Sequence, residues 1–115
     1  MSEHDEQVAL FAWAEWMKTQ YPRLRWMYAV PNAAKRSPQL ANYMKAEGLK
    51  SGVPDVVVPI PTAQYHGLYI EMKFKGNKPS IAQKEWLEYL DSVGYATAVC
   101  LSFDAARVVI EEYLR

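Results

Sequence analysis

Several residues and patterns on which common protein classes depend are scarce in this sequence. Its 115 residues include one cysteine and two histidines, and its formal net charge is zero. A single cysteine cannot form a disulfide framework or a cysteine-rich zinc site, and Cys100, within the apolar run 96–101, is expected to be a buried, inert thiol. We expect His4, near the start, and His66, in a loop, to be solvated, so a serine-histidine-aspartate catalytic set is not favoured.

Long apolar runs are also missing. No stretch approaches the roughly 20 apolar residues that a membrane span needs. Acidic residues at positions 3, 5 and 6 stand where a secretory signal carries lysines. We therefore expect a cytoplasmic protein with no membrane partner.

The neutral total charge hides an uneven distribution. From Lys18 to Lys84 there are eleven Lys or Arg residues against three acidic ones, so this segment carries a net charge of +8. Such a segment suits a surface that binds polyanions, although runs of charge are more often simply solvated. Charge alone does not decide between these two interpretations.

Hydrophobic spacing and helix-end signals predict eight elements. Ser37, Pro38 and Gly48, for example, are typical of the start and end of a helix. The order αβαββαβα predicts one α/β domain over residues 1–115, with a mixed sheet flanked by helices. The predicted helices cover residues 5–20, 38–47, 81–93 and 103–114, and the predicted strands cover 25–30, 55–59, 67–73 and 95–101.

The strand 67–73 carries the first candidate for a catalytic site. Period-two alternation puts Glu71 and Lys73 on one face, roughly 6 to 7 Å apart along the strand. Asp55 opens the apolar strand 55–59, so a hairpin of the two strands would bring its carboxylate near Glu71. Two carboxylates and an ammonium at one end of a sheet suit a hard divalent cation. The alternative is that Glu71 and Lys73 form an exposed ion pair and that Asp55 is an ordinary turn residue.

Two further polar residues lie on apolar helix faces. Glu6 precedes Leu10 by four residues on the core-facing stripe of the first helix, where an unpaired carboxylate would be costly. Glu6 either binds a metal or a lysine, or is an acid that the helix dipole favours. Gln83 precedes Trp86 on the inner face of the third helix, where it either positions water or a phosphate, or caps the first turn.

An ordered set of motifs runs through most of the chain. Its members are Glu6 on the first helix, Val30-Pro31-Asn32, Gly52-Val53-Pro54-Asp55, Gly67 leading to Ile70-Glu71-Met72-Lys73, and Gln83 with Trp86, Leu87 and Gly94. Over about residues 5–100 this set resembles the virus-type replication-repair nuclease (VRR-NUC) domain, a family of the PD-(D/E)xK nucleases with a restriction-endonuclease-like fold. One difference is that Ala33 follows Asn32 where many relatives have glycine, which leaves the shape of this loop open.

The resemblance implies a nuclease that hydrolyses the phosphodiester bonds of DNA with Mg²⁺ or Mn²⁺. It makes Asp55, Glu71 and the Met72 carbonyl metal ligands, adds Glu6 as a further ligand or organiser of a second site, and lets Lys73 orient the attacking water. Gln83 completes the expected catalytic set.

Stand-alone members of the family resemble dimeric resolvases of branched DNA, so the expected partners are a four-way (Holliday) junction and a second copy of the chain. Flap cleavage, a non-catalytic nucleic-acid-binding module and a purely structural domain are the alternatives. We expect exposed aromatic residues in the dimer interface, namely Trp16, Tyr43, Trp86, Tyr89 and Tyr113. The expected DNA contacts are Asn32, Lys35, Arg36, Lys45, Lys50, Lys75, Lys78 and Lys84.

Overall fold

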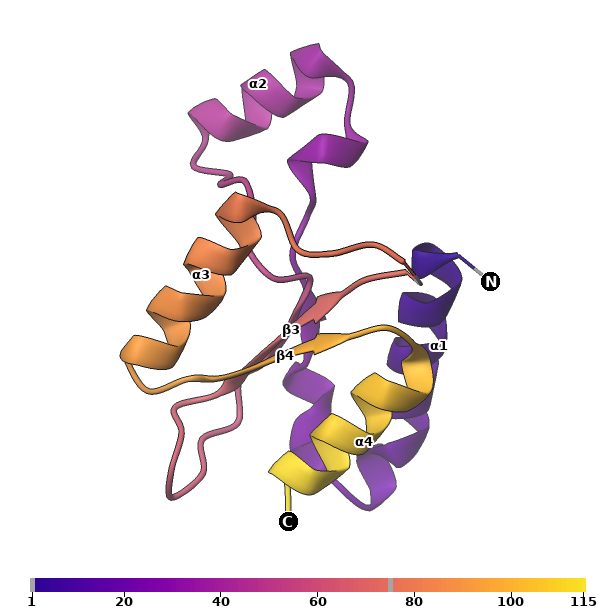
Figure 1. The fold of residues 1–115 in the computed structure, drawn as a ribbon. Coiled ribbons are helices and arrows are strands. Elements are labelled where there is room, and N and C mark those ends of the chain that lie inside the picture. The colour runs from indigo at the N-terminus through magenta and orange to yellow at the C-terminus, as the bar shows by residue number, and fades with distance from the viewer. Residues whose placement is uncertain (1, 75) are drawn as a thin grey trace.

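The computed structural model describes residues 2–74 and 76–115, and its centre is a four-stranded mixed sheet with helices on both sides (Figure 1). Eight principal elements follow the predicted order αβαββαβα, and the α/β fold class is confirmed. The helices are α1 (Glu3–Trp16), α2 (Pro38–Ala46), α3 (Ile81–Ser92) and α4 (Phe103–Tyr113), and the strands are β1 (Tyr28–Ala29), β2 (Val56–Val58), β3 (Leu68–Met72) and β4 (Ala96–Cys100).

The segment between α1 and β1 differs from its prediction. The α-helix ends at Trp16 rather than near residue 20, and continues as a short 3₁₀ helix, η1 (Met17–Thr19). The predicted strand 25–30 is wrong over its first half, because a second 3₁₀ helix, η2, covers Pro22–Trp26. Pro22 favours a first helical turn rather than only ending the previous one. β1 is correspondingly short, and a third 3₁₀ helix, η3 (Ala33–Lys35), follows it.

The sheet has the strand order β1-β2-β3-β4. β2 is antiparallel to both β1 and β3, whereas β4 runs parallel to β3. Val56 pairs with Ile70 across the predicted hairpin. One residue further along, the same register sets Asp55 opposite Glu71, at the end of the sheet where β3 finishes.

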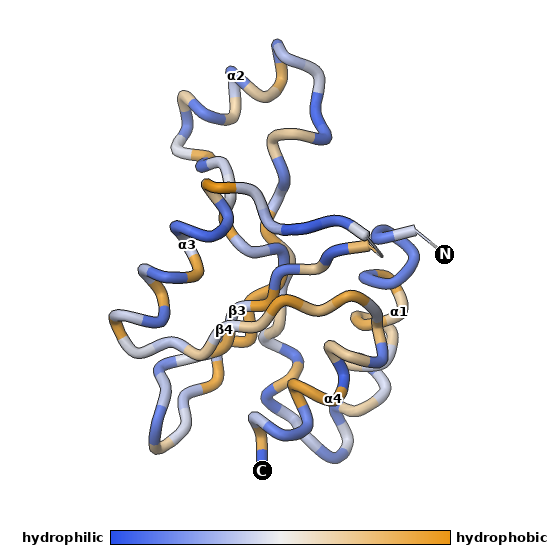
Figure 2. The backbone as a smooth tube through the Cα atoms, viewed as in Figure 1, coloured by the Kyte–Doolittle hydropathy of each residue, from blue (hydrophilic) through white to orange (hydrophobic). Residues whose placement is uncertain are grey.

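The hydrophobic core lies between one face of this sheet and the helices α1 and α4, and Figure 2 shows the hydrophobic strands at the centre of the molecule. Leu10 of α1 and Ile110 of α4 are both 0% exposed, and each contributes about 2 kcal/mol through burial. From the strands, the core takes Val56, Val58, Leu68, Ile70, Met72 and Cys100. Cys100 is buried, as predicted, and this burial raises the pKa of its thiol to about 11.

Residues 31–50 form an arm, containing η3 and α2, that extends away from the sheet in Figure 1. Ser37 caps α2 by accepting a hydrogen bond from the Leu40 amide, and Gly48 adopts a φ of 110° after its end, as the sequence predicts. No helix among the described residues is long and apolar enough to cross a membrane.

Candidate active site

Two carboxylates meet where β2 begins and β3 ends, as the hairpin prediction requires. The Asp55 Oδ2 atom accepts a hydrogen bond of 2.8 Å from the Met72 amide, which anchors its side chain on the neighbouring strand. The Glu71 carboxyl is so close that the side chain and the charge of Asp55 both raise its pKa. The pair therefore forms a compact acidic site rather than two independent surface charges.

The loop before Asp55 is held by tight packing against α3. Gly52 has a φ of 87°, and a Cβ atom there would lie 2.7 Å from the backbone carbon of Ala82. Only glycine fits such a position. Trp86 closes the same contact by donating a 3.1 Å hydrogen bond to the Ser51 carbonyl. The motif at residues 52–55 thus sets both the position of Asp55 and the position of the first turn of α3.

Glu71 is the one charged residue among the buried residues of the described chain, with 2% of its surface exposed. Its Oε2 atom accepts a hydrogen bond, whereas its buried Oε1 atom has no hydrogen-bond partner within the described residues. Burial, followed by the neighbouring Asp55, raises the pKa of Glu71 to about 9. A buried carboxylate oxygen without a donor is costly, so this position favours a cationic ligand.

Gln83 caps the first turn of α3, as one of the two alternatives expected, and also contacts Glu71. Its Oε1 atom accepts a 2.7 Å hydrogen bond from the Ser80 amide, and Ser80 caps the Gln83 amide in return, which completes a capping box. Its Nε2 atom donates a 3.1 Å hydrogen bond to Glu71 Oε2. The first turn of α3 therefore fixes the orientation of the Glu71 carboxyl.

Lys73 lies beside this pair, as alternation along β3 predicts. Its Nζ atom is 3.9 Å from Glu71 Oε2, and 15% of its side chain is exposed. This separation is longer than a hydrogen bond, and the positive charge partly offsets the raised pKa of Glu71. The Lys73 ammonium group thus lies near the Glu71 carboxyl without forming a close, hydrogen-bonded ion pair.

The oxygen ligands at this site are of the type that a hard divalent cation prefers, although they are few. No group of three or more His, Cys, Asp or Glu side chains that could hold a metal occurs in the part of the chain that the structure describes. Asp55 and Glu71 supply two carboxylates, and the oxygen of Glu71 that lacks a donor is available. With the backbone carbonyl of Met72, these are the oxygen ligands that Mg²⁺ and Mn²⁺ prefer, with water completing the shell.

α1 carries a second acid, Glu3, nearly one turn before the expected Glu6. After burial and the neighbouring Asp55, the charge of Glu3 makes a small contribution that raises the pKa of Glu71. Glu3 Oε2 also accepts a 3.5 Å hydrogen bond from Asn77 Nδ2, in the segment that follows β3. Glu6 is half-buried on α1.

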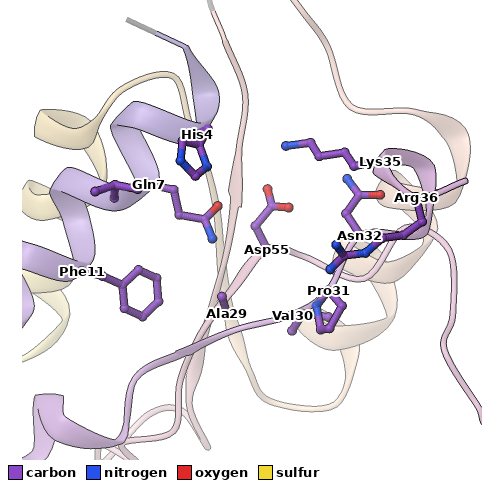
Figure 3. Close-up of a pocket in the computed structure, with 11 residues that line it drawn as sticks. His4, Gln7, Phe11, Ala29, Val30, Pro31, Asn32, Lys35, Arg36 and Asp55 are labelled. Carbon is purple, nitrogen blue, oxygen red and sulfur yellow. The ribbon is translucent and has the colours of Figure 1, made fainter. Parts of the chain in front are cut away.

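A cavity of about 540 Å³ opens beside Asp55, between α1 and the start of the arm. Figure 3 shows His4 and Gln7 on one side of Asp55 and Lys35 on the other. His4 is exposed, as expected, and it also lines this cavity. The sequence signal for this cavity wall was the spacing of residues 4, 7 and 8, which places them on one face of a helix. Which face of α1 meets the arm depends on the tertiary fold, so the sequence alone did not identify the cavity.

Six of the expected DNA contacts are basic residues on exposed surface. Asn32 is half-buried at the start of η3, and Lys75 lies outside the described residues. Ala33 is buried in η3, and no residue other than glycine has a positive φ within the described ranges, so alanine fits the loop. The exposed basic residues are Lys35, Arg36, Lys45, Lys50, Lys78 and Lys84.

The aromatic residues expected at a dimer interface divide into two groups. Trp16, Tyr43 and Tyr89 are 75%, 67% and 59% exposed. Trp86 is half-buried against the loop at Ser51, and Tyr113 packs on the core while its hydroxyl donates to the Ile60 carbonyl at 2.6 Å. Trp86 and Tyr113 are thus only partly exposed, and their polar atoms bond within the chain.

Comparisons with known proteins identify the relatives of this architecture. The sequence pattern of the VRR-NUC domain matches residues 1–104. A solved structure named VRR_NUC domain protein superimposes with a TM-score of 0.81 at 29% sequence identity, over 99% of this chain and 88% of its own. No match was found among curated proteins.

Proposed function

Because this chain belongs to the VRR-NUC domain family, a family of nucleases, we propose that it is an endonuclease that hydrolyses DNA phosphodiester bonds with Mg²⁺ or Mn²⁺. The observation that carries this proposal is the buried Glu71 carboxyl, whose Oε1 atom has no hydrogen-bond partner among residues 2–74 and 76–115, while Asp55 stands beside it. A structural acid at this depth would be expected to have every oxygen paired. A cation at this position would satisfy the oxygen and stabilise both carboxylates in their charged form.

Each residue of the site has a distinct role in this proposal. Asp55, Glu71 and the Met72 carbonyl hold the ion, and Gln83 keeps the Glu71 carboxyl in position through its 3.1 Å hydrogen bond. When bound, Mg²⁺ or Mn²⁺ supplies a water of lowered pKa and stabilises charge on the attacking and leaving oxygens.

Lys73 adds a fixed positive charge next to the phosphate and orients the attacking water. Its 3.9 Å distance from Glu71 leaves its three donors available for these tasks. α1 offers two acids at this end, Glu6, which the family resemblance implies, and Glu3, which accepts a hydrogen bond from Asn77 after β3. One of them would be a further ligand or the organiser of a second metal position.

Metal dependence is tested with a panel of labelled linear, flapped and four-way DNAs, incubated with Mg²⁺, with Mn²⁺, with Ca²⁺ and with EDTA. We expect cleavage with Mg²⁺ and Mn²⁺, none in EDTA, and little with Ca²⁺, whose looser coordination activates water poorly. Undiminished cleavage in EDTA would exclude the metal mechanism. Binding without cleavage under every condition would identify a non-catalytic DNA-binding module.

We further propose that two copies act together as a resolvase of four-way junctions in DNA recombination or repair. One copy offers one catalytic site, and symmetric paired cuts need two sites related by a two-fold axis. The exposed Trp16, Tyr43 and Tyr89 supply apolar surface for such a contact. Light scattering combined with mapping of cut sites on an immobile junction tests this, and a monomer that nicks one arm would contradict it. Cleavage confined to flaps would instead support the alternative substrate.

A further inference from the structure

The cavity beside Asp55 has two chemically different walls. One wall is the outer face of α1, where Val8 and Phe11 lie beside His4 and Gln7. The other wall belongs to β1 and the arm, and brings Lys35 and Arg36 to the opposite side. Figure 3 shows the Asp55 carboxylate between these walls, so a group held in the cavity would directly adjoin the proposed reaction centre.

Local hydrogen bonds hold the backbone of the basic wall. Asn32 Oδ1 accepts a 2.9 Å hydrogen bond from the Ala34 amide and so caps η3. The Lys35 amide bonds to the Asn32 carbonyl at 3.2 Å, and the Arg36 amide bonds to the Ala33 carbonyl at 3.1 Å. Two long cationic side chains thus start from a fixed turn, which suits them to bind the phosphates on either side of one nucleoside.

The α1 wall suits a base rather than another phosphate. Val8 is an apolar side chain that is 55% exposed, and Figure 3 shows the Phe11 ring directed toward the cavity. An aromatic ring can stack on the face of any base. The Gln7 amide offers both a donor and an acceptor, and the His4 imidazole adds a further polar group, which together match the edge of a base.

We propose that this cavity binds one unpaired nucleoside of the DNA strand, adjacent to the phosphate that is cut. Its volume of about 540 Å³ is in the range of sites for small organic ligands. A paired base inside a stacked duplex could reach it only by flipping out, which is least costly where the base is already unpaired. The proposal rests on the nuclease function above, and makes strands that are unpaired at a branch point, flap or gap the preferred substrates.

The first experiment uses the smallest probe that contains a base between two phosphates, thymidine 3′,5′-bisphosphate, with Ca²⁺ present. Binding is followed by NMR chemical-shift changes. We expect shifts at His4, Val8 and Lys35, and affinity at least about tenfold higher than for the same bisphosphate without a base, given the contribution of a stacked base. Equal affinities would overturn the proposal and leave a phosphate site only.

A matched pair of variants tests the cavity itself. Val8→Trp fills the space from one wall, whereas Val108→Trp places the same side chain at an exposed position of α4, outside the cavity. We expect Val8→Trp to abolish thymidine bisphosphate binding and Val108→Trp to leave it unchanged, while both retain the same thermal unfolding midpoint and Ca²⁺ affinity. Equal thymidine bisphosphate binding by the two variants would overturn the proposal.

These experiments distinguish failure of the cavity proposal from failure of the nuclease proposal. If wild-type protein cuts DNA and Val8→Trp cuts flapped and fully paired substrates with unchanged relative rates, the cavity proposal fails alone. If no DNA is cut but thymidine bisphosphate still binds in a Val8-dependent way, the nuclease proposal fails and the nucleoside site stands. The combined proposal requires Val8→Trp to lose cleavage of the unpaired strand.

Discussion

Replacing Glu71 by glutamine should stabilise the metal-free protein while removing its activity. Glutamine has nearly the same shape, and its amide oxygen can still accept the hydrogen bond from Gln83. Its NH₂ group would occupy the place of the Oε1 atom that has no partner, and can donate to the neighbouring Asp55. The substitution therefore removes a buried acid, and adds a donor where the site has too many acceptors.

The effect should depend on pH in a defined direction. In the unfolded chain Glu71 loses its proton near the ordinary pKa of 4.5, whereas in the metal-free folded protein its pKa is raised to about 9. Between these values the folded state binds more protons, so this residue lowers the free energy of unfolding as pH rises. At roughly 1.4 kcal/mol per unit, the change from pH 5 to pH 7 is at most about 3 kcal/mol. We expect about 1 to 3 kcal/mol, because water screens part of the interaction.

Urea unfolding in EDTA at pH 5 and pH 7 measures this change. The difference in unfolding free energy between Glu71→Gln and wild type should grow by about 1 to 3 kcal/mol over this range. The control is Glu88→Gln, on the exposed face of α3, which should show no such growth. Adding Mg²⁺ should stabilise wild type but not Glu71→Gln. A variant that is equally or less stable than wild type at pH 7 would refute the argument.

Four further substitutions probe other parts of the structure. Glu3→Gln and Glu6→Gln each remove an acid of α1, and we expect the variant that removes the acid serving the metal site to lower the single-turnover cleavage rate by about 100-fold or more; unchanged rates in both would leave Glu3 and Glu6 as ordinary helix-end acids. Lys73→Ala should reduce the same rate about 100-fold without weakening Ca²⁺ binding in calorimetry, and an unchanged rate would make it an ordinary ion-pair partner. Tyr113→Phe removes the hydrogen bond to the Ile60 carbonyl, and should lower the unfolding free energy in urea by about 1 kcal/mol with cleavage unaltered. A loss of cleavage by Tyr113→Phe would contradict this prediction, and would show that packing of the core beneath α4 affects the active site.

The prediction of the fold succeeded where local signals were strong. Ser37 and Ser80 cap α2 and α3 as predicted, and the apolar run 56–58 forms a buried strand. It failed between residues 17 and 27, where two 3₁₀ helices form. An apolar segment with a proline is compatible with a strand or a tight helix, and here burial of Leu24 in the core favours the helix.

The acidic site was predictable because it depends on short-range geometry. Alternation along β3 places Glu71 and Lys73 on one face, and the hairpin register brings Asp55 opposite Glu71. The depth of Glu71 was not predictable in the same way. Its 2% exposure arises because α3 returns over the end of the sheet and delivers Gln83 to it.

What the sequence by itself determined about this protein is the order of its elements, the two carboxylates with their lysine, and the resemblance to a nuclease family. These follow from residue spacing, capping and motifs, which act over a few residues of the chain. Tertiary structure alone decided how deeply Glu71 is buried, and that His4 lines the cavity beside Asp55. The physical reason is that these relations depend on the angle between α1 and the sheet and on the position of the arm. Both are determined by packing between segments that are distant in the sequence.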